Sequence, residues 1–413
     1  MAADRFVDRI LANITYWRSK VELQTDPSPV GLRAERENIR RAIVYGLAQP
    51  ETWNQAAELL LALDYFIEQS GEWASWQAQL QVALEQCGDR RPALKVRLLN
   101  LSGRCYRRGR DLQAALNTHR QEEALALQHG LDAHLPQTQL SFGTLYWRER
   151  DYEQAQKYAE EALNGFLEGG AGERQMGGVY ALLGLVAYGR GRYQESIPCH
   201  EKALGHFRKT PLIRLQARSL INLALAQEGT GETDAAARTY LEARRLLENT
   251  CFELEKTRLE LSYGTLLFNT NRLAEAEEAY LRARSPALNQ SDNLYFQALA
   301  ANNLGNVYLQ QGRLGEAELI LRQSLVLWDR AHAHVQRLNS VGTLARVLAQ
   351  QGQLAEAVLY HKEAIEGLEA MPDDAWARQL LEDFRTDSDL LSAEAAKQGQ
   401  AGKRPVQETP AAL

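Results

Sequence analysis

Apolar residues recur at spacings of three and four along most of the chain, which predicts amphipathic helices rather than strands. Seven stretches share one pattern: a helical segment, a short break that usually contains Gly, and an Ala or Ser five residues after that Gly. The small residues after the break are Ala114, Ala155, Ser196, Ala236, Ala276, Ala317 and Ala357. They follow one another at intervals of 40 or 41 residues, which indicates a repeated structural unit.

A second small residue lies twelve positions before each of these, on the first helix of each copy. The set is Ser102, Gly143, Gly184, Ala224, Gly264, Gly305 and Ala345. Small side chains at both places let two antiparallel helices approach closely, so the unit is predicted to be a helical hairpin. One hairpin cannot bury its own apolar faces, so the copies must stack. The predicted fold is all-α: a right-handed α-solenoid of about eight hairpins with a C-terminal capping helix.

Two of the copies resemble the tetratricopeptide repeat family. The matching residues are Leu304, Gly305, Tyr308, Gly312, Leu314 and Ala317 in one copy, and Leu183, Gly184, Gly191, Tyr193, Ser196, Ala203 and Leu204 in another. The period is similar to that of the longer repeats of kinesin light chains and bacterial peptide-sensing regulators. The resemblance covers residues 94 to 371 and implies a solenoid that binds other proteins, without identifying the ligand.

A degenerate eighth copy precedes these seven, with its break at Gly71 and a second helix predicted from Trp73 to Gln86. Trp76 takes the place of the usual Ala. Upstream, one apolar stripe on a first helix is formed by Phe6, Ile10, Ile14, Trp17 and Val21, and Thr25 to Gly31 breaks that helix.

The next predicted helix, Leu32 to Leu47, resembles the helix that joins the nucleotide-binding module to the repeat sensor in STAND-type signalling ATPases. The residues that carry this resemblance are Glu37, Asn38, Ile39, Arg40, Ala42 and Ile43. The phosphate loop of those ATPases is missing, so at most the sensor arm is implied.

The predicted organisation has four parts. Residues 1–50 form an N-terminal helical segment, and residues 51–371 form the solenoid. A capping helix spans 372–397, starting at Pro372 and reaching Lys397. Residues 398–413 have few large apolar side chains and two prolines, so we predict a disordered tail.

Short polar residues recur two positions before the small residue of the first helix, on a face expected to line the concave groove. The six that can form hydrogen bonds are Asn100, Ser141, Asn222, Ser262, Asn303 and Thr343. The remaining copy, the third along the chain, has Leu182 at this position. An extended peptide needs partners for its backbone N–H and C=O groups at a regular rise, so we predict a peptide-binding ladder. The triplets Asn303 to Gly305 and Asn222 to Ala224 resemble the asparagine ladder of related repeat proteins. The alternative is that the short side chains only fill a crowded groove.

Arg218 and Arg258 lie one helical turn before Asn222 and Ser262. They partly resemble the carboxylate clamp of chaperone-binding tetratricopeptide domains, although the complete set of basic and Asn residues is absent.

An aromatic residue lies four positions after the small residue in three consecutive copies, and arginines follow it. The strip consists of Tyr106, Trp147, Tyr188, Arg107, Arg108, Arg148 and Arg190. From Asp89 to Arg110, eight Lys or Arg residues stand against one acid. The strip could hold an acidic partner segment. The alternative is that the aromatics pack on the next repeat and the arginines solvate the turns.

The chain has 413 residues, of which 45% are hydrophobic and 24% charged, with a net charge of -6. This composition predicts a folded cytoplasmic protein without a membrane span or signal segment. An overall acidic chain does not favour nucleic acid as a partner.

The chemistry of the side chains offers no catalytic motif. The four cysteines have no metal-knuckle or disulfide-frame spacing, Cys199 and His200 are helix neighbours that face apart, and no nucleotide-binding or hydrolase motif occurs. We therefore expect no cofactor and no enzyme activity, but a scaffold, sensor or adaptor that binds a protein or peptide. The competing hypothesis is a regulatory subunit of a separate enzyme, such as an ATPase, a protease or a nuclease.

Overall fold

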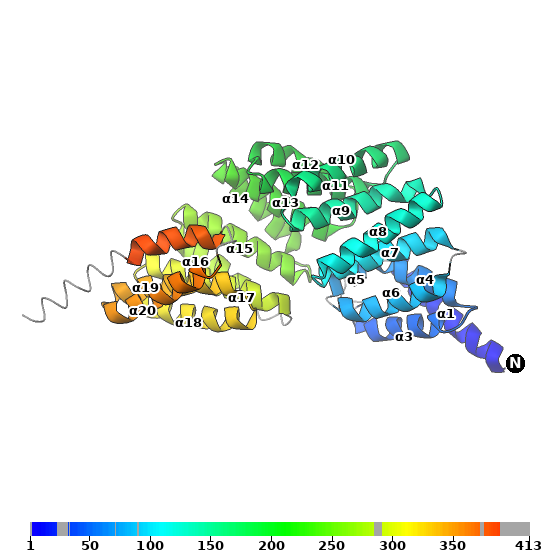
Figure 1. Cartoon of the computed structure of the whole chain (residues 1–413), viewed down its shortest axis with the longest axis horizontal. Coiled ribbons are helices and arrows are strands. Elements are labelled where there is room, and N and C mark those ends of the chain that lie inside the picture. Colours follow the sequence, from blue (N-terminus) through cyan, green and yellow to red (C-terminus); the bar gives the residue numbers. More distant parts are fainter. Residues whose placement is uncertain are drawn as a thin grey trace, which may run out of the picture. The chain divides into compact units, whose positions relative to one another are not determined.

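The computed structural model describes residues 2–22, 32, 34–70, 72–88, 91–284, 291–371 and 376–388 (Figure 1). Over these residues the chain consists of helices joined by short turns, with no strand. None of the described helices is long and apolar enough to cross a membrane. The chain divides into two compact units, Met1–Glu255 and Lys256–Leu413, which are described separately below.

The first unit begins with helices that complete the N-terminal segment and the degenerate hairpin. These are α1 (Ala2–Glu22), α3 (Arg36–Leu47), α4 (Trp53–Ala62), α5 (Asp64–Ser70) and α6 (Trp73–Cys87). Four regular hairpins follow: α7 (Pro92–Arg108) with α8 (Leu112–Gln128), α9 (Leu135–Arg148) with α10 (Tyr152–Gly169), α11 (Glu173–Gly189) with α12 (Tyr193–Arg208), and α13 (Ile213–Gly229) with α14 (Thr233–Leu247). A short 3-10 helix, η1 (Asp132–His134), precedes α9.

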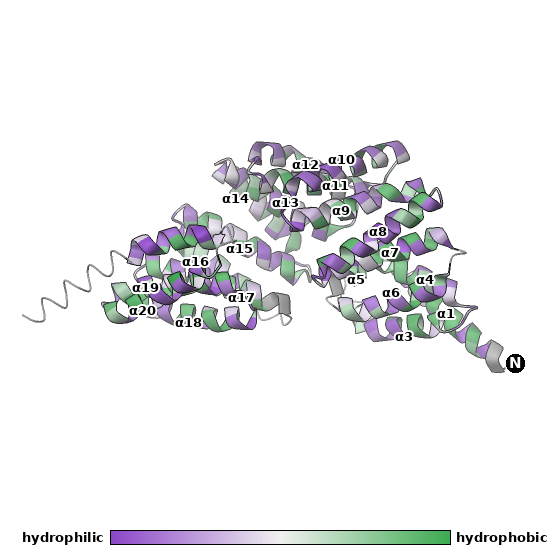
Figure 2. Cartoon of the chain, viewed as in Figure 1, coloured by the Kyte–Doolittle hydropathy of each residue, from purple (hydrophilic) through white to green (hydrophobic). Residues whose placement is uncertain are grey.

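The second unit contains three hairpins: α15 (Glu253–Asn269) with α16 (Leu273–Ala283), α17 (Ser291–Gln310) with α18 (Leu314–Arg330), and α19 (His334–Gln350) with α20 (Leu354–Glu369). The predicted all-α solenoid of stacked hairpins is confirmed. Hydrophobic and hydrophilic residues alternate along each helix (Figure 2), as expected for helices that bury one face.

One residue in each turn adopts a left-handed backbone conformation, and a fully buried small residue follows five positions later. The turn residues are Arg110, Arg150, Gly191, Gly231, Asn271, Gly312 and Gly352, with φ between 59° and 83°. In the first copy the left-handed residue is Arg110 and not Gly109, whose φ is -72°. The predicted Ala114 is therefore wrong by one residue: Ala115 is completely buried, while Ala114 is only half-buried.

The small residues of the first helices permit close contact within each hairpin. A Cβ added to Gly184 would lie 2.6 Å from the His200 ring, and one added to Gly305 would lie 2.5 Å from Leu321. In the first copy this role belongs to Gly103, whose added Cβ would lie 2.5 Å from the ring of His119. The predicted Ser102 is thus also one residue out of phase.

The N-terminal segment packs as the apolar stripe predicts, with one exception. Ile10, Ile14 and Trp17 are buried together with residues of α3 and α4. Phe6, which was expected on the same stripe, is half exposed. The degenerate copy has its second helix where predicted, and Trp76 is buried against Phe66.

Residues 376–388 are helical and cover the last hairpin of the second unit. Phe384 lies against Gly342, and Asp387 accepts a hydrogen bond of 2.8 Å from Arg346. This contact agrees with the predicted capping role. The predicted start at Pro372, the end at Lys397 and the tail 398–413 lie outside the described residues, and the boundaries of the four predicted parts remain predictions.

Candidate functional site

The predicted ladder residues lie on the first helices of six hairpins, three in each unit. In the first unit Asn100, Ser141 and Asn222 lie on α7, α9 and α13; in the second unit Ser262, Asn303 and Thr343 lie on α15, α17 and α19. We call the side of each first helix that carries these residues the first-helix face.

Two residues of the first unit take part in a buried polar network. The Asn100 amide donates to Glu122 Oε1 at 2.9 Å and to Ser141 Oγ at 3.4 Å. Thr138 donates to the same Glu122 oxygen at 2.6 Å, and His119 Nδ1 lies 2.7 Å from the other oxygen. All five side chains are buried, and their hydrogen bonds link two neighbouring repeats, while His119 Nε2 has no partner in the described part of the chain.

The position of Asn100 follows from the corrected phase of the first copy. With Gly103 as the small residue, the ladder position is taken by Leu101, which is fully buried. Asn100 is therefore one residue away from the ladder position, and its amide is committed to Glu122. Thr343 is also buried, and its hydroxyl donates to the Asn339 carbonyl of its own helix at 3.2 Å.

Asn222 and Ser262 differ from the buried members of the ladder. Both side chains are half-buried, and neither forms a hydrogen bond with any residue in the described part of the chain. A polar group on a helix face without an internal partner can bind water or a ligand.

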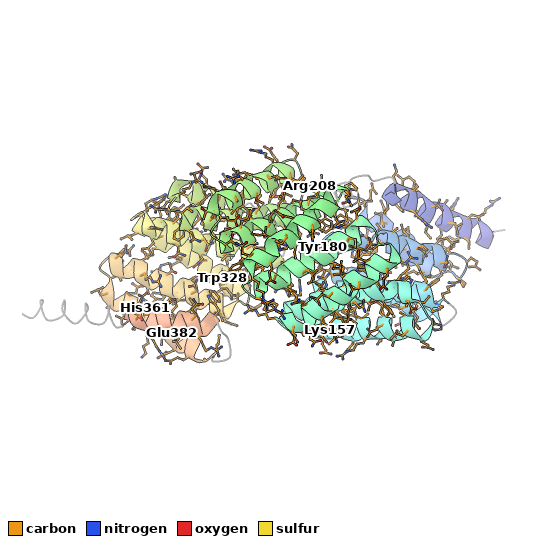
Figure 3. The ribbon with its side chains drawn as sticks, turned by 90° about the horizontal axis from the view of Figure 1, so that it is seen from above. Lys157, Tyr180, Arg208, Trp328, His361 and Glu382 are labelled. Atoms are coloured by element: carbon orange, nitrogen blue, oxygen red, sulfur yellow. The ribbon has the colours of Figure 1, made fainter. Side chains whose placement is uncertain are left out.

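Asn303 is held by a chain of hydrogen bonds that begins in the core. The Trp328 indole donates to Ser340 at 2.9 Å, and Ser340 donates to Asn302 at 2.8 Å. The Asn302 amide in turn donates to Asn303 Oδ1 at 3.4 Å. Trp328, which is labelled in Figure 3, is 1% exposed. Because the Asn303 oxygen is an acceptor inside this chain, its NH₂ group remains available as a donor.

The two arginines of the predicted clamp lie one turn before Asn222 and Ser262. Arg218 is half-buried on α13, and Arg258 is exposed on α15. Arg218 belongs to the first unit and Arg258 to the second.

The aromatic strip belongs to the first unit, and the contact of Trp147 supports the alternative that the aromatics pack on the next repeat. Trp147 Nε1 donates to the Leu185 carbonyl of the next first helix at 3.3 Å. The Tyr188 ring lies 5.2 Å from that of Tyr193, and burial raises the pKa of the Tyr188 hydroxyl. Tyr106 is half-buried.

The arginines of the strip interact mainly with neighbouring turns and helices. Arg148 donates to the Arg107 carbonyl at 3.0 Å, and Arg190 donates to the Gln156 side chain. Arg107, Arg108 and Arg190 are half-buried, and Arg148 is exposed. These contacts favour the alternative in which the arginines solvate the turns between helices.

The first unit also contains an ion cluster that the sequence pattern did not predict. Asp64 of α5 contacts Arg104 of α7 at 3.2 Å and Arg174 of α11 at 3.1 Å. A signal was present: Asp64 lies seven residues before Gly71, where the regular copies have Gly or Ala. Its partners could not be foreseen, because Arg174 is 110 residues away in sequence.

The side chains with catalytic potential include Cys199 and His200, which are neighbours on α12. The described residues contain no group of three or more His, Cys, Asp or Glu that could hold a metal ion. Burial raises the pKa of the Cys199 thiol, which disfavours the reactive thiolate. The His200 ring lies against Gly184, and neither of its nitrogens has a hydrogen-bond partner among the described residues.

Comparisons with known proteins agree with the repeat pattern. Models of the tetratricopeptide repeat match residues 136–164, 175–249 and 296–370. No curated protein matches the sequence significantly.

Solved structures show the same fold at low sequence identity. A STAND protein with a tetratricopeptide repeat sensor from Pyrococcus horikoshii matches with a TM-score of 0.61 and 14% identity over 85% of this chain and 55% of that chain. The apo quorum sensor NprR from B. thuringiensis matches with a TM-score of 0.55 and 14% identity, over 79% of this chain and 97% of that one.

A Rap protein in complex with the competence and sporulation factor has a TM-score of 0.51 and 12% identity, over 85% of this chain and 99% of that one. These likenesses are to the fold. The three matched segments are tetratricopeptide repeats, and the described part of the chain has the α-solenoid fold of these structures.

Proposed function

We propose that this chain is a non-catalytic scaffold that holds a protein or peptide segment on its first-helix face, as a sensor or adaptor in intracellular signalling. The observation that carries the proposal is the arrangement at Asn303. A core network fixes its oxygen, and its NH₂ group is left to donate. Ser262, one repeat earlier in the same unit, also has a hydroxyl without a partner among the described residues.

Such preorganised polar groups suit an extended backbone. A ligand C=O that accepts from Asn303 and a ligand N–H or C=O that meets Ser262 would replace water at two successive repeats. Each hydrogen bond contributes about 0.5 to 1.5 kcal/mol to binding. The structures of NprR, a quorum sensor, and of a Rap protein bound to its factor support a binding role for this fold.

The test uses the full-length chain and the partner recovered with it by affinity capture. Ser262→Ala with Asn303→Ala should weaken binding of that partner about tenfold, because two hydrogen bonds are lost. Gln323→Ala removes an exposed amide from the second helix α18 and serves as the matched control. The melting temperature should change little in both variants. A loss of stability without a loss of affinity would show that Ser262 and Asn303 are structural.

The likeness to the STAND protein favours one second candidate. This chain spans 55% of the length of that protein, whose printed description includes a tetratricopeptide repeat sensor. The same binding face could therefore serve as the sensor of a separately encoded ATPase. Copurification of an ATPase with the full-length chain, and its release by the captured partner, would favour this version.

A further inference from the structure

Asp64 occupies an unusual position in the first unit. In the seven regular copies the equivalent first-helix residue is Gly or Ala. Four of these glycines face the second helix of their own hairpin: Gly103, Gly184, Gly264 and Gly305. In the degenerate copy the first helix is interrupted at Leu63, between α4 and α5. Trp76 of the second helix, α6, is buried in place of the usual small residue. The Asp64 carboxylate does not serve the hairpin contact and instead reaches two other first helices.

The partners of Asp64 form a two-arginine clamp. Arg174 approaches both carboxylate oxygens, with Nη1–Oδ1 at 3.3 Å and Nη2–Oδ2 at 3.1 Å. Arg104 donates to Oδ2 at 3.2 Å. The Arg174 guanidinium also lies 5.7 Å from the centre of the Tyr65 ring. Planar guanidinium groups bind carboxylates in this two-pronged way wherever the carboxylate comes from.

The Arg174 side of the clamp is the accessible one. Arg174 retains 38% of its side-chain exposure, whereas Asp64 retains 23% and Arg104 only 15%. The more exposed Arg174–Asp64 pair is screened by solvent, so a ligand that offers several carboxylates can compete with the internal aspartate there first. Arg108 extends the basic character of this face, since it lies four residues after Arg104 on α7.

We propose that Arg104 and Arg174 form a binding site for an acidic peptide segment, and that Asp64 occupies this site in the free chain as an internal competitor. An acidic segment then binds only by displacing Asp64. This competition lowers the affinity of the chain for every acidic segment, so only strongly acidic segments bind. The inference rests on the proposed function, because both place a ligand on first helices. It uses different residues, in the other unit from Ser262 and Asn303.

The experiment measures binding of fluorescein-labelled hexa-aspartate to the full-length chain by fluorescence anisotropy at low salt. Asp64→Asn should increase the affinity about three- to fivefold, since the internal competitor is lost. Arg174→Gln should weaken binding by a similar factor, and the double variant should resemble Arg174→Gln.

Two matched controls change the net charge equally at another ion pair of the same unit. Arg208 and Glu242 pair on the second helices α12 and α14, and Arg208 is labelled in Figure 3. Glu242→Gln and Arg208→Gln should leave the affinity within twofold of wild type. Equal effects of Asp64→Asn and Glu242→Gln would overturn the proposal, because net charge alone would then explain them.

Three further measurements complete the test. If Asp64→Asn lowers the helical signal, the Arg174→Gln variant alone is used, and an unchanged hexa-aspartate affinity of that variant overturns the proposal. Tighter binding of hexathymidylate than of hexa-aspartate would overturn the peptide assignment in favour of nucleic acid. Ser262→Ala with Asn303→Ala should leave hexa-aspartate affinity unchanged, so failure of the proposed function and failure of this inference are distinguishable.

Discussion

At the scale of single residues, buried histidines link the stability of the repeats to pH. His200 is completely buried on α12, and neither of its ring nitrogens has a hydrogen-bond partner in the described part of the chain. Burial lowers its pKa to about 4. His361 occupies the equivalent position in the last hairpin, and burial lowers its pKa too. Both rings are therefore neutral when the protein is folded at neutral pH.

This arrangement predicts a loss of stability in acid. Below the ordinary histidine pKa near 6.5 the unfolded chain binds a proton at His200 that the folded chain does not bind until about pH 4. The stabilisation is complete above pH 6.5 and decreases as the pH falls. Between pH 7.5 and 5.0 the loss from His200 should be about 2 kcal/mol.

Denaturation in urea at the two pH values checks this prediction. His200→Leu should remove this share of the pH dependence, because leucine does not bind a proton. The substitution should fit, because Leu321 fills the equivalent place beside Gly305. His129→Gln, at an exposed histidine after α8, is the control and should retain it. An unchanged pH dependence in His200→Leu would show that other groups cause the acid effect.

The turn residues show why one copy was assigned one residue out of phase. Most of the breaks contain a glycine, which adopts positive φ without steric cost, and the predicted small residue lies five positions after it. In the first copy Gly109 lies within one residue of that position, but Arg110 adopts the positive φ. The error moved the small residue from Ala115 to Ala114 and placed Asn100 in the ladder. The turns with Arg150 and Asn271 contain no neighbouring glycine, and the small residues predicted after them, Ala155 and Ala276, are the buried ones.

At the scale of helices, the contact within each hairpin depends on which residue faces the partner helix. Ala115 is completely buried on α8, whereas the adjacent Ala114 is half-buried. Adjacent residues on a helix point about 100° apart, so only one of them can occupy the contact. The corrected phase therefore makes different predictions for two neighbouring alanines.

Ala115→Leu should lower stability by about 1 to 3 kcal/mol, since three extra carbon atoms must fit into a filled contact. Ala114→Leu is the same substitution one residue earlier and should change stability by less than about 0.5 kcal/mol. Thermal unfolding followed by circular dichroism compares the two variants. A larger loss for Ala114→Leu would restore the phase assigned from Gly109.

The helices themselves could be predicted because their signals are local. Apolar spacing, breaks and small residues recur in every copy, and the second helix of the degenerate copy begins at Trp73 as expected. The burial of the ladder residues could not be predicted in the same way. Whether Asn222 is accessible or Asn100 is enclosed depends on neighbouring helices, such as α8 with its buried Glu122.

At the scale of the whole molecule, the polar first-helix residues belong to two compact units. Ser262 and Asn303 form the best-defined pair, and both lie in the second unit. In the first unit Asn222 is accompanied by the acid-binding clamp of Arg104 and Arg174. Each unit thus offers its own chemistry: hydrogen bonds to a backbone in one, and charge recognition in the other.

The central claim is that the first-helix face, rather than the opposite helices, binds the partner. The most direct test is quantitative affinity capture from the source cell with three immobilised full-length chains: wild type, Ser262→Ala with Asn303→Ala, and Leu319→Ala with Leu359→Ala. Leu319 and Leu359 lie on second helices of the same unit and are 62% and 67% exposed.

Mass spectrometry should find a partner retained by wild type and by the Leu319→Ala, Leu359→Ala variant. Its recovery should fall about tenfold with the Ser262→Ala, Asn303→Ala variant, in proportion to two lost hydrogen bonds. Melting curves of the three chains confirm that equal amounts are folded. Loss of the partner from the leucine variant, with full recovery on the first-helix variant, would contradict the account and place the binding surface on the second helices.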